Sequence, residues 1–200
     1  MKALGLTGGI GMGKSACADL LRARGIPVVD SDDLAREVVE PGQPALAEVQ
    51  RAFGPGIVST DGRLNREELA RRVFADTAAR RQLESILHPR IRQLWLAEIH
   101  QWRAAEHPLA VVIIPLLFET RAESDFDATL CVACSAATQR QRLLARHWPP
   151  EQMEQRIQAQ LPPEKKMELA NFVIWTEGPL NLHAAQLDRI LVAFKTFAPS

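Results

Sequence analysis

The sequence predicts an α/β fold of three layers, built on a parallel sheet of about five strands, with a helical insertion and a helical lid. Three observations support this prediction. A glycine-rich loop at residues 8–15 lies between a strand-length apolar run and a segment of helical spacing. Continuous apolar runs at residues 110–114 and 128–134 are typical of parallel strands buried on both faces. The remaining sequence is mostly of helical pattern.

The loop itself, GGIGMGKS at residues 8–15, fits the phosphate-binding pattern G-x-x-x-x-G-K-[ST]. Glycines let the backbone curl so that several N–H groups converge on phosphate oxygens. The helix that begins near Lys14 adds the positive end of its dipole. Lys14 is expected to reach the β- and γ-phosphates, and the Ser15 hydroxyl is expected to ligate Mg²⁺. The sequence therefore predicts a nucleoside triphosphate site in a strand–loop–helix setting.

A dinucleotide-binding loop is the alternative for the same stretch. Residues 11–16 fit G-x-G-x-x-A, and Asp30 and Asp32 follow at a suitable distance. However, the first glycine of that motif should directly follow the strand, and residues 7–10 intervene. The motif also leaves Lys14 and Ser15 without a role. The triphosphate interpretation is therefore favoured.

Composition narrows the functional class. The formal net charge is +0, so no bulk attraction to nucleic acid or to an anionic membrane is implied. No apolar run approaches the ~18 residues of a membrane span, and the first strand leaves no room for a signal peptide. Three cysteines are too few for a disulfide framework, and Cys131 and Cys134 are more typical of buried small hydrophobes. We expect a cytoplasmic protein without a nucleic-acid or membrane partner.

Acidic residues follow the second predicted strand, residues 26–29. Asp30 or its neighbours can cap the next helix. In an open parallel sheet, however, the carboxyl ends of the strands face the ligand crevice. We therefore favour a functional role for one of Asp30 and Asp32, as a base or a metal partner.

The following helical block is longer than a crossover between strands requires, which indicates an inserted substrate-binding subdomain. Helices are predicted over residues 44–53, from a cap at Asn65 to 75, over 77–87 and over 89–103. His88 lies at the elbow between the last two. It is either a cap or surface residue or, with Arg90 and Arg92, part of an anion site.

The predicted strand at residues 110–114 ends in Pro115, where a GTPase or motor ATPase would carry a magnesium-binding Asp. This favours a small-molecule kinase in which another carboxylate helps to hold the metal. Leu116, Leu117 and Phe118 either belong to the core or contact a substrate, and the sequence alone favours the core.

A predicted helix at residues 136–146 carries Arg140, Arg142 and Arg146. Such a basic face is usually only solvated. Here prolines and a second predicted helix, residues 151–159, follow, which is typical of a lid that folds over transferring phosphates. The last strand is predicted at 172–175, and an amphipathic helix at 180–194 ends the pattern.

Taken together, the motifs resemble those of the dephospho-CoA kinase family. The resemblance rests on GLTGGIGMGKS at 5–15, PVVDSD at 27–32, LHPRIR at 87–92, PLLFE at 115–119, TQRQRLLAR at 138–146 and RIQAQ at 156–160. It implies a nucleoside-monophosphate-kinase-like fold and phosphorylation of the ribose 3′-hydroxyl of dephospho-CoA by ATP, the last step of coenzyme A synthesis. It also implies three parts: a core at 1–33, 108–137 and 167–200, a CoA-binding subdomain at 34–107, and a lid at 138–166.

The resemblance implies roles for individual residues. Asp32 is the expected general base, with Lys14 and Arg146 stabilising the transferring phosphoryl group. ATP contacts are implied for Gly9, Gly11, Met12, Gly13, Lys14, Ser15, Ala16 and Arg142, and acceptor contacts for Asp32, His88, Arg92, Leu117, Phe118 and Glu119. Mg²⁺, held by Ser15 and Asp32, is the expected cofactor, and a monomer or weak homo-oligomer is the expected state.

The chain departs from the family pattern at a few positions. Met12 replaces Ser in the loop, Ser31 replaces Ala between the two aspartates, His147 follows the lid arginine in place of Asp, and Asn171 and Thr176 differ near the last strand. These departures affect lid pairing and adenine contacts rather than the reaction class. Two alternatives stay open: a kinase for another small acceptor, and a switch-type nucleotide binder.

Overall fold

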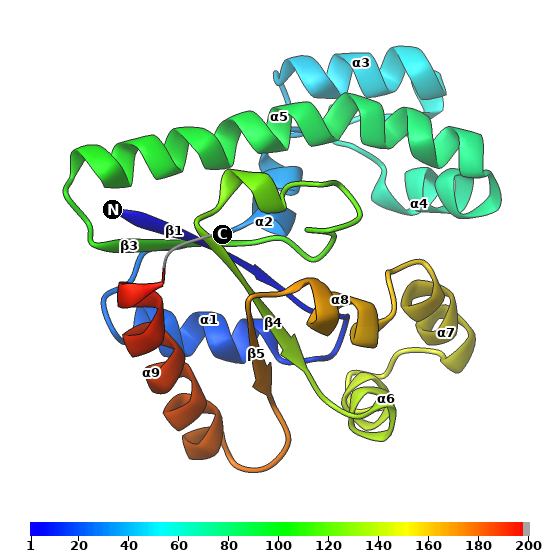
Figure 1. Ribbon diagram of the computed structural model, residues 1–200. Coiled ribbons are helices and arrows are strands. Elements are labelled where there is room, and N and C mark those ends of the chain that lie inside the picture. The colour runs from blue at the N-terminus through cyan, green and yellow to red at the C-terminus, as the bar shows by residue number, and fades with distance from the viewer. Residues whose placement is uncertain (198–200) are drawn as a thin grey trace. The chain divides into compact units, whose positions relative to one another are not determined.

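The computed structural model describes residues 1–197, apart from the side chains of residues 74 and 75. Helices and strands are interspersed along the chain, with runs of helices between the second and third strands and between the fourth and fifth (Figure 1). Their bounds, with η marking short 3-10 helices, are β1 (Lys2–Thr7), α1 (Lys14–Arg22), β2 (Val28–Asp30), α2 (Ser31–Glu37), α3 (Pro44–Phe53), η1 (Pro55–Ile57), α4 (Arg66–Ala75), α5 (Thr77–Ala104), β3 (Leu109–Ile113), η2 (Glu123–Asp125), β4 (Ala128–Ala133), α6 (Ala136–Leu144), α7 (Pro150–Gln158), α8 (Pro163–Leu169), β5 (Phe172–Trp175) and α9 (Leu180–Thr196).

The five strands form one sheet in the order β2-β3-β1-β4-β5, which confirms the predicted α/β fold. The central strand, β1, runs parallel to both of its neighbours, with Leu4 opposite Val111 on β3 and Ala128 on β4. Outside β4, β5 is also parallel. Because β1 is central, the glycine-rich loop that follows it leaves the sheet between two strands, where parallel α/β sheets bind their ligands.

The sheet is held by apolar side chains along its central strands, which are buried on both faces. Leu4 and Leu6 of β1 are fully buried, as is Leu130 of β4. Helices α1 and α9 pack against each other, and they bury Leu21 and Phe194 in the same cluster (Figure 1). Each such side chain, removed from water, contributes about 1.5–3 kcal/mol to the hydrophobic driving force, so this cluster fixes the strand that carries the loop.

The chain divides into two compact units, one made of residues 1–29 and 102–200 and the other of residues 30–101. The second unit has its own core, in which Val49, Phe53 and Leu69 pack around Ile57. The predicted division into core, CoA-binding subdomain and lid concerns function, and it stays a prediction.

Two predicted boundaries in the second unit are confirmed and one is wrong. The predicted helix at residues 44–53 is α3, and Asn65 caps α4 by accepting a hydrogen bond from the Glu68 N–H at 3.1 Å. The elbow predicted at His88 does not exist, because α5 continues through Pro89 as one helix. A proline removes only one helical hydrogen bond, and burial of Ile91, Trp95 and Ile99 beyond it keeps the helix continuous.

The structure adds a helix that the sequence pattern did not predict. The helix α8 begins at Pro163, a position that favours proline because its missing N–H would have no partner there. This short helix packs against β4, and its Lys166 is completely buried.

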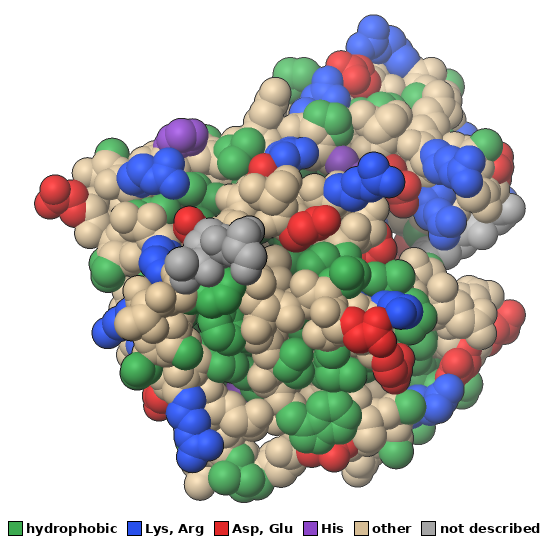
Figure 2. Space-filling view, in the orientation of Figure 1, with side chains coloured by type: hydrophobic (Ala, Val, Ile, Leu, Met, Phe, Trp, Pro, Cys, Tyr) green, Lys and Arg blue, Asp and Glu red, His purple; other side chains and the backbone are tan. Residues whose placement is uncertain are grey.

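The three cysteines are free and buried, as predicted. Burial raises the pKa of the Cys17 thiol to about 12 and that of Cys131 to about 11. Among the described residues, no helix is both long and apolar enough to cross a membrane. On the face drawn in Figure 2, basic and acidic side chains are interspersed, in keeping with the net charge of +0.

The side chain of Lys2 caps the carboxyl end of α9. The Lys2 ammonium donates to the carbonyl oxygens of Phe194, Lys195 and Phe197 at 2.8, 3.1 and 2.6 Å. These carbonyls lie at the carboxyl end of α9, where intrahelical partners run out and the helix dipole favours a cation.

Replacing Lys2 by methionine is therefore expected to lower the free energy of unfolding by about 1–2 kcal/mol, because the carbonyls lose a charged donor. Urea unfolding followed by circular dichroism measures the change. Lys195→Met is the matched control, since the Lys195 side chain lies on the exposed surface of the same helix end. Equal losses in the two variants would contradict this role of Lys2.

Candidate nucleotide site

The glycine-rich loop has the geometry that the motif predicts. It begins directly after β1, and α1 begins at Lys14. Gly13 precedes the helix with a φ of 98°, in the left-handed region. A Cβ at this position would also come within 3.2 Å of the Thr176 side chain. Glycine is thus required here both by conformation and by space. The first glycine after the strand is Gly8, so the structure favours the triphosphate pattern over the dinucleotide one.

The lysine of the motif lies along the loop. The Lys14 ammonium donates to the carbonyl oxygens of Gly8 and Gly9 at 2.7 and 3.0 Å. Ser15 lies in the first turn of α1 and is exposed, and Ala16 is half-buried. Gly9 and Gly11 are buried on either side of the loop tip at Ile10. This arrangement concentrates positive charge and helix-end N–H groups in one place.

Met12 is buried, although its position is inside the loop. Its side chain is 1% exposed and packs with Ala133, Cys134 and Met167. The Met12 N–H donates to the Gly9 carbonyl at 3.2 Å, in a turn of the loop itself. The methionine side chain therefore anchors the loop to the end of β4. Its predicted contact with ATP stays a prediction.

Thr176, one of the departures from the family pattern, joins the loop to the end of β5. Its hydroxyl donates to the Met12 carbonyl at 3.0 Å. Arg142 of α6 donates to the Thr176 hydroxyl at 2.9 Å and to the Thr176 carbonyl at 2.6 Å. The Arg142 guanidinium is thereby fixed beside the loop.

An open cavity of about 490 Å³ adjoins Arg142. Its lining residues are Thr138, Gln141, Arg142, Ala145, Glu177 and Gly178. The Glu177 carboxylate accepts hydrogen bonds from the Ser135 N–H at 2.9 Å and from the Thr138 hydroxyl at 2.8 Å. These bonds, those from Ser135 first, lower the pKa of Glu177 to about 2. Glu177 is therefore an anion that fixes one wall of the cavity.

The other arginines of the predicted lid differ in their surroundings. Arg140 of α6 forms an ion pair with Glu154 of α7 at 2.8 Å. Arg146 lies just after α6 and is exposed, and its side chain forms no hydrogen bond or ion pair with any residue in the described part of the chain. His147, the departure beside it, has a φ of 58°. The chain thus turns sharply after Arg146, which leaves this guanidinium at the surface.

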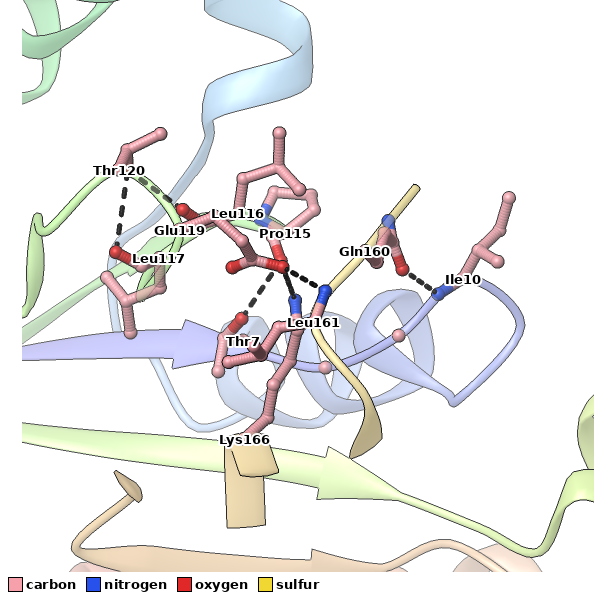
Figure 3. A network of polar contacts seen from close by, with 12 residues as sticks. Thr7, Ile10, Pro115, Leu116, Leu117, Glu119, Thr120, Gln160, Leu161 and Lys166 are labelled. Atoms are coloured by element: carbon pink, nitrogen blue, oxygen red, sulfur yellow. Dashed lines mark hydrogen bonds and ion pairs between the residues drawn. The ribbon is translucent and has the colours of Figure 1, made fainter. Parts of the chain in front are cut away.

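The segment after β3 is tied to the residues around α8 (Figure 3). The Lys166 ammonium, 0% exposed, donates to the Pro115 carbonyl at 2.5 Å and pairs with the Glu119 carboxylate at 2.8 Å. The same Glu119 oxygen accepts a hydrogen bond from the Leu161 N–H at 2.8 Å. Leu117 is fully buried and Phe118 is half-buried. Of the predicted acceptor contacts in this segment, Phe118 presents the most accessible apolar side chain.

The second unit holds Asp30, the last residue of β2, and Asp32. Asp30 caps α2, since its carboxylate accepts a hydrogen bond from the Asp32 N–H at 2.9 Å. Asp32 lies in the first turn of that helix and its side chain is exposed. The structure therefore separates the two aspartates into a helix cap and an acid whose carboxylate faces solvent.

The basic candidates of the second unit lie on α5. His88 and Arg92 are four residues apart and so share a face of the helix. His88 is half-buried, and burial lowers the pKa of its imidazole, with Glu84 acting in the opposite direction. Arg92 is exposed. The pair thus places an imidazole and a guanidinium on one face of α5.

The donor chemistry is compatible with Mg²⁺ bound together with a nucleotide. In the part of the chain that the structure describes, no group of three or more His, Cys, Asp or Glu side chains could hold a metal ion alone. Mg²⁺ is usually held by one or two protein oxygens together with phosphate oxygens and water. The exposed Ser15 hydroxyl and the exposed Asp32 carboxylate are donors of that kind.

Sequence reasoning missed most side chains that support the loop. Gln139 and Gln160 form hydrogen bonds with Ile10 at the loop tip. Thr176 bonds the Met12 carbonyl, and Glu177 accepts the Ser135 N–H beside the cavity. Lys166 bonds the Pro115 carbonyl after β3. The two glutamines occur in the motifs TQRQRLLAR and RIQAQ, which was the available signal. The ion pair of Lys166 had no local signal, because Glu119 lies far from it in the sequence.

The Glu177 anion gives a pH dependence that can be measured. Its folded-state pKa of about 2 is below the ordinary value of 4.5, so its stabilising contribution is complete above pH 4.5 and is lost as the pH falls toward 2. Between these values the free energy of unfolding of Glu177→Gln is expected to fall less steeply than that of the unmodified protein. Chemical unfolding at a series of pH values measures both slopes. Parallel slopes would contradict the hydrogen bonding of Glu177.

Comparison with known proteins places the chain. A profile of the family described as "Dephospho-CoA kinase" matches residues 2–181. A dephospho-CoA kinase of Anaeromyxobacter dehalogenans is 46% identical over 192 residues, which are 96% of this chain and 91% of that protein. One from Bdellovibrio bacteriovorus is 40% identical over 191 residues, 96% and 95% of the two chains.

Solved structures agree with these relatives. The crystal structure of a Thermus thermophilus protein, 36% identical, superposes with a TM-score of 0.85 and covers 96% of this chain and 97% of its own. A dephospho-CoA kinase from Campylobacter jejuni, 19% identical, has the same fold, with a TM-score of 0.72 and 97% coverage of both chains. With its phosphate loop, its five-stranded parallel sheet and these relatives, the chain belongs to the dephospho-CoA kinase family.

Proposed function

We infer that this chain transfers the γ-phosphoryl group of ATP to the 3′-hydroxyl of the dephospho-CoA ribose, which gives coenzyme A and ADP and completes coenzyme A synthesis. The observation that carries this conclusion is the phosphate loop after the central strand, in a chain that matches the family over residues 2–181. The absence of an Asp at the end of β3, where Pro115 stands, argues against a switch-type nucleotide binder. A cytoplasmic location stays a prediction.

The phosphates of ATP are proposed to bind the loop. The loop N–H groups other than that of Ile10, which bonds Gln160, supply the donors together with the amino-terminal end of α1. Lys14 already lies across the loop on two carbonyl oxygens, so a small rotation of its flexible side chain would bring the ammonium to the β- and γ-phosphates.

The adenine ring is proposed to enter the cavity beside Arg142. Two hydrogen bonds to Thr176 hold the guanidinium in one orientation, and a planar guanidinium stacks well on an aromatic ring. The opposite wall, at Glu177 and Gly178, belongs to the chain after β5. This cavity supports a role for Arg142 in ATP binding rather than in the chemical step.

Asp32 is proposed to act as the general base. Its carboxylate would accept the proton of the 3′-hydroxyl as that oxygen attacks the γ-phosphorus and the bond to the leaving ADP oxygen breaks. The structure supports Asp32 over Asp30 for this role, because the Asp30 carboxylate already caps α2. Arg146, exposed at the start of the lid, is proposed to stabilise negative charge on the transferring group.

Ser15 and Asp32 are the residues proposed to hold Mg²⁺ together with ATP. When bound, the ion neutralises charge on the phosphates. The acceptor is proposed to contact His88 and Arg92, a face that suits its anionic phosphates, and Phe118. Leu117 is buried and Glu119 is ion-paired with Lys166. Both are proposed to hold the segment that carries Phe118 in position for the acceptor.

The direct test is incubation with ATP, Mg²⁺ and dephospho-CoA, followed by mass spectrometry. Coenzyme A is expected to form, and EDTA is expected to abolish its formation because the phosphates lose their counter-ion. Parallel reactions with a nucleoside and with a sugar acid test the other kinase readings. Phosphate on one of those acceptors but none on dephospho-CoA would overturn the proposed substrate, and ATP hydrolysis without any phosphorylated acceptor would overturn the kinase.

Replacing Asp32 by asparagine is expected to lower kcat by about 10²–10⁴-fold, because the amide cannot accept the hydroxyl proton. ATP binding, measured by calorimetry, is expected to stay close to normal. Asp33→Asn is the matched control, since Asp33 is exposed in the same helical turn and pairs with Arg36 on the surface. Near-normal turnover by the Asp32 variant would remove Asp32 from the base role.

A further inference from the structure

The tip of the phosphate loop is held by two glutamines from opposite ends of the predicted lid segment. The Ile10 N–H donates to the Gln160 side-chain oxygen at 3.0 Å, as Figure 3 shows. The Ile10 carbonyl accepts a hydrogen bond from the Gln139 side-chain nitrogen at 2.8 Å. Gln139 lies on α6 and is 4% exposed. Gln160 lies between α7 and α8 and is half-buried. Both peptide units of Ile10 are thus fixed by side chains.

The flanking residues make this clamp necessary. Gly9 and Gly11 stand on either side of Ile10, and Gly11 has a φ of 75°. Glycines allow a peptide unit to rotate at little cost, and the turn bond from the Met12 N–H to the Gly9 carbonyl at 3.2 Å uses neither the N–H nor the carbonyl of Ile10. Two hydrogen bonds to Ile10 oppose such rotation.

Gln160 is itself held firmly. The next residue, Leu161, donates its N–H to Glu119, and Lys166 pairs with the same carboxylate and with the Pro115 carbonyl. The Thr7 hydroxyl at the end of β1 donates to that carbonyl at 3.2 Å. Because Lys166 has no contact with water, breaking this ion pair would leave a buried charge, which is strongly unfavourable. The segment 160–166 is therefore anchored at both ends.

We propose that Gln139 and Gln160 are positioning residues that hold the Ile10 peptide units in the orientation that ATP binding requires, and that they link the lid segment to the phosphate loop. This proposal rests on the proposed function for its ligand. In the range from Gly9 to Ala16, Ile10 is the residue for which the family resemblance implies no ATP contact. Its N–H and carbonyl can therefore bond to the two glutamines while the N–H groups of its neighbours bind the phosphates.

The two glutamines have opposite hydrogen-bonding roles, which gives the proposal a specific signature. Gln160 acts as an acceptor, so Gln160→Glu retains the required oxygen. Gln139 acts as a donor, so Gln139→Glu places an acceptor against the Ile10 carbonyl. The same chemical change should therefore preserve the Ile10 contact at position 160 and break it at position 139.

The test compares Gln160→Met with Gln158→Met, which changes an exposed glutamine two residues earlier in the lid. In Gln160→Met we expect faster hydrogen exchange at the Ile10 amide and about fivefold or greater weakening of ATP binding by calorimetry. The melting temperature and the KM for dephospho-CoA should change little. Gln158→Met should match the unmodified protein in all four measurements. Gln139→Glu should weaken ATP binding, whereas Gln160→Glu should keep slow Ile10 exchange.

Several results would overturn the proposal. Unchanged ATP affinity and Ile10 exchange in Gln160→Met would show that the clamp has no role. Tighter ATP binding would make Gln160 a competitor for phosphate instead. If Gln158→Met changed ATP binding and Ile10 exchange as much as Gln160→Met, the changes would reflect a general effect of substitution in the lid and not the bond to Ile10. Since ATP binding is measured without acceptor, failure of the enzyme to phosphorylate dephospho-CoA would refute the substrate and leave this test intact. Because Gln160 is only half-buried, the Gln160 variants test the proposal even if a variant of the buried Gln139 does not fold.

Discussion

A loop that offers most of its N–H groups to phosphate has few of them left to hold itself in shape. This constraint accounts for the surroundings of residues 8–15. The carbonyl of Met12 is bonded by Thr176, and both peptide units of Ile10 are bonded by glutamine side chains. Each of these bonds comes from outside the loop. These bonds restrain a loop that its glycines would otherwise leave flexible. A loop ordered in advance loses less conformational entropy when it binds ATP.

The ion pair between the buried Lys166 and the partly exposed Glu119 serves the same purpose at longer range. Burying the lysine charge costs free energy, and attraction to the carboxylate compensates for that cost only where the two groups meet. The pair therefore specifies how the chain after β3 meets the chain before α8. Since the Leu161 N–H shares the Glu119 carboxylate, one fixed geometry places residue 160 beside the loop. If residues 138–166 act as the predicted lid, we expect their motion to concentrate in α7 and in the turn at His147, which lie before this anchor.

Local patterns predicted the elements that local chemistry determines. The motif identified the loop, apolar runs identified the central strands, and a capping residue identified the start of α4. The continuity of α5 through Pro89 was missed because burial of side chains beyond the proline outweighs one lost hydrogen bond. The partners of Ile10 were missed for a different reason. They lie 129 and 150 residues away in the sequence, and no periodicity links positions so distant. The family resemblance supplied the candidate roles of Asp32 and Arg146, which spacing alone could not.

The buried cysteines have a consequence for an enzyme whose substrate and product both end in a thiol. Exchange between a protein thiol and a disulfide requires a thiolate that the disulfide can reach. Cys17 and Cys131 meet neither condition, since their pKa values of about 12 and about 11 keep them protonated near neutral pH and the fold covers them. While the chain is folded, oxidised coenzyme A therefore has no nucleophile at these positions with which to form a mixed disulfide.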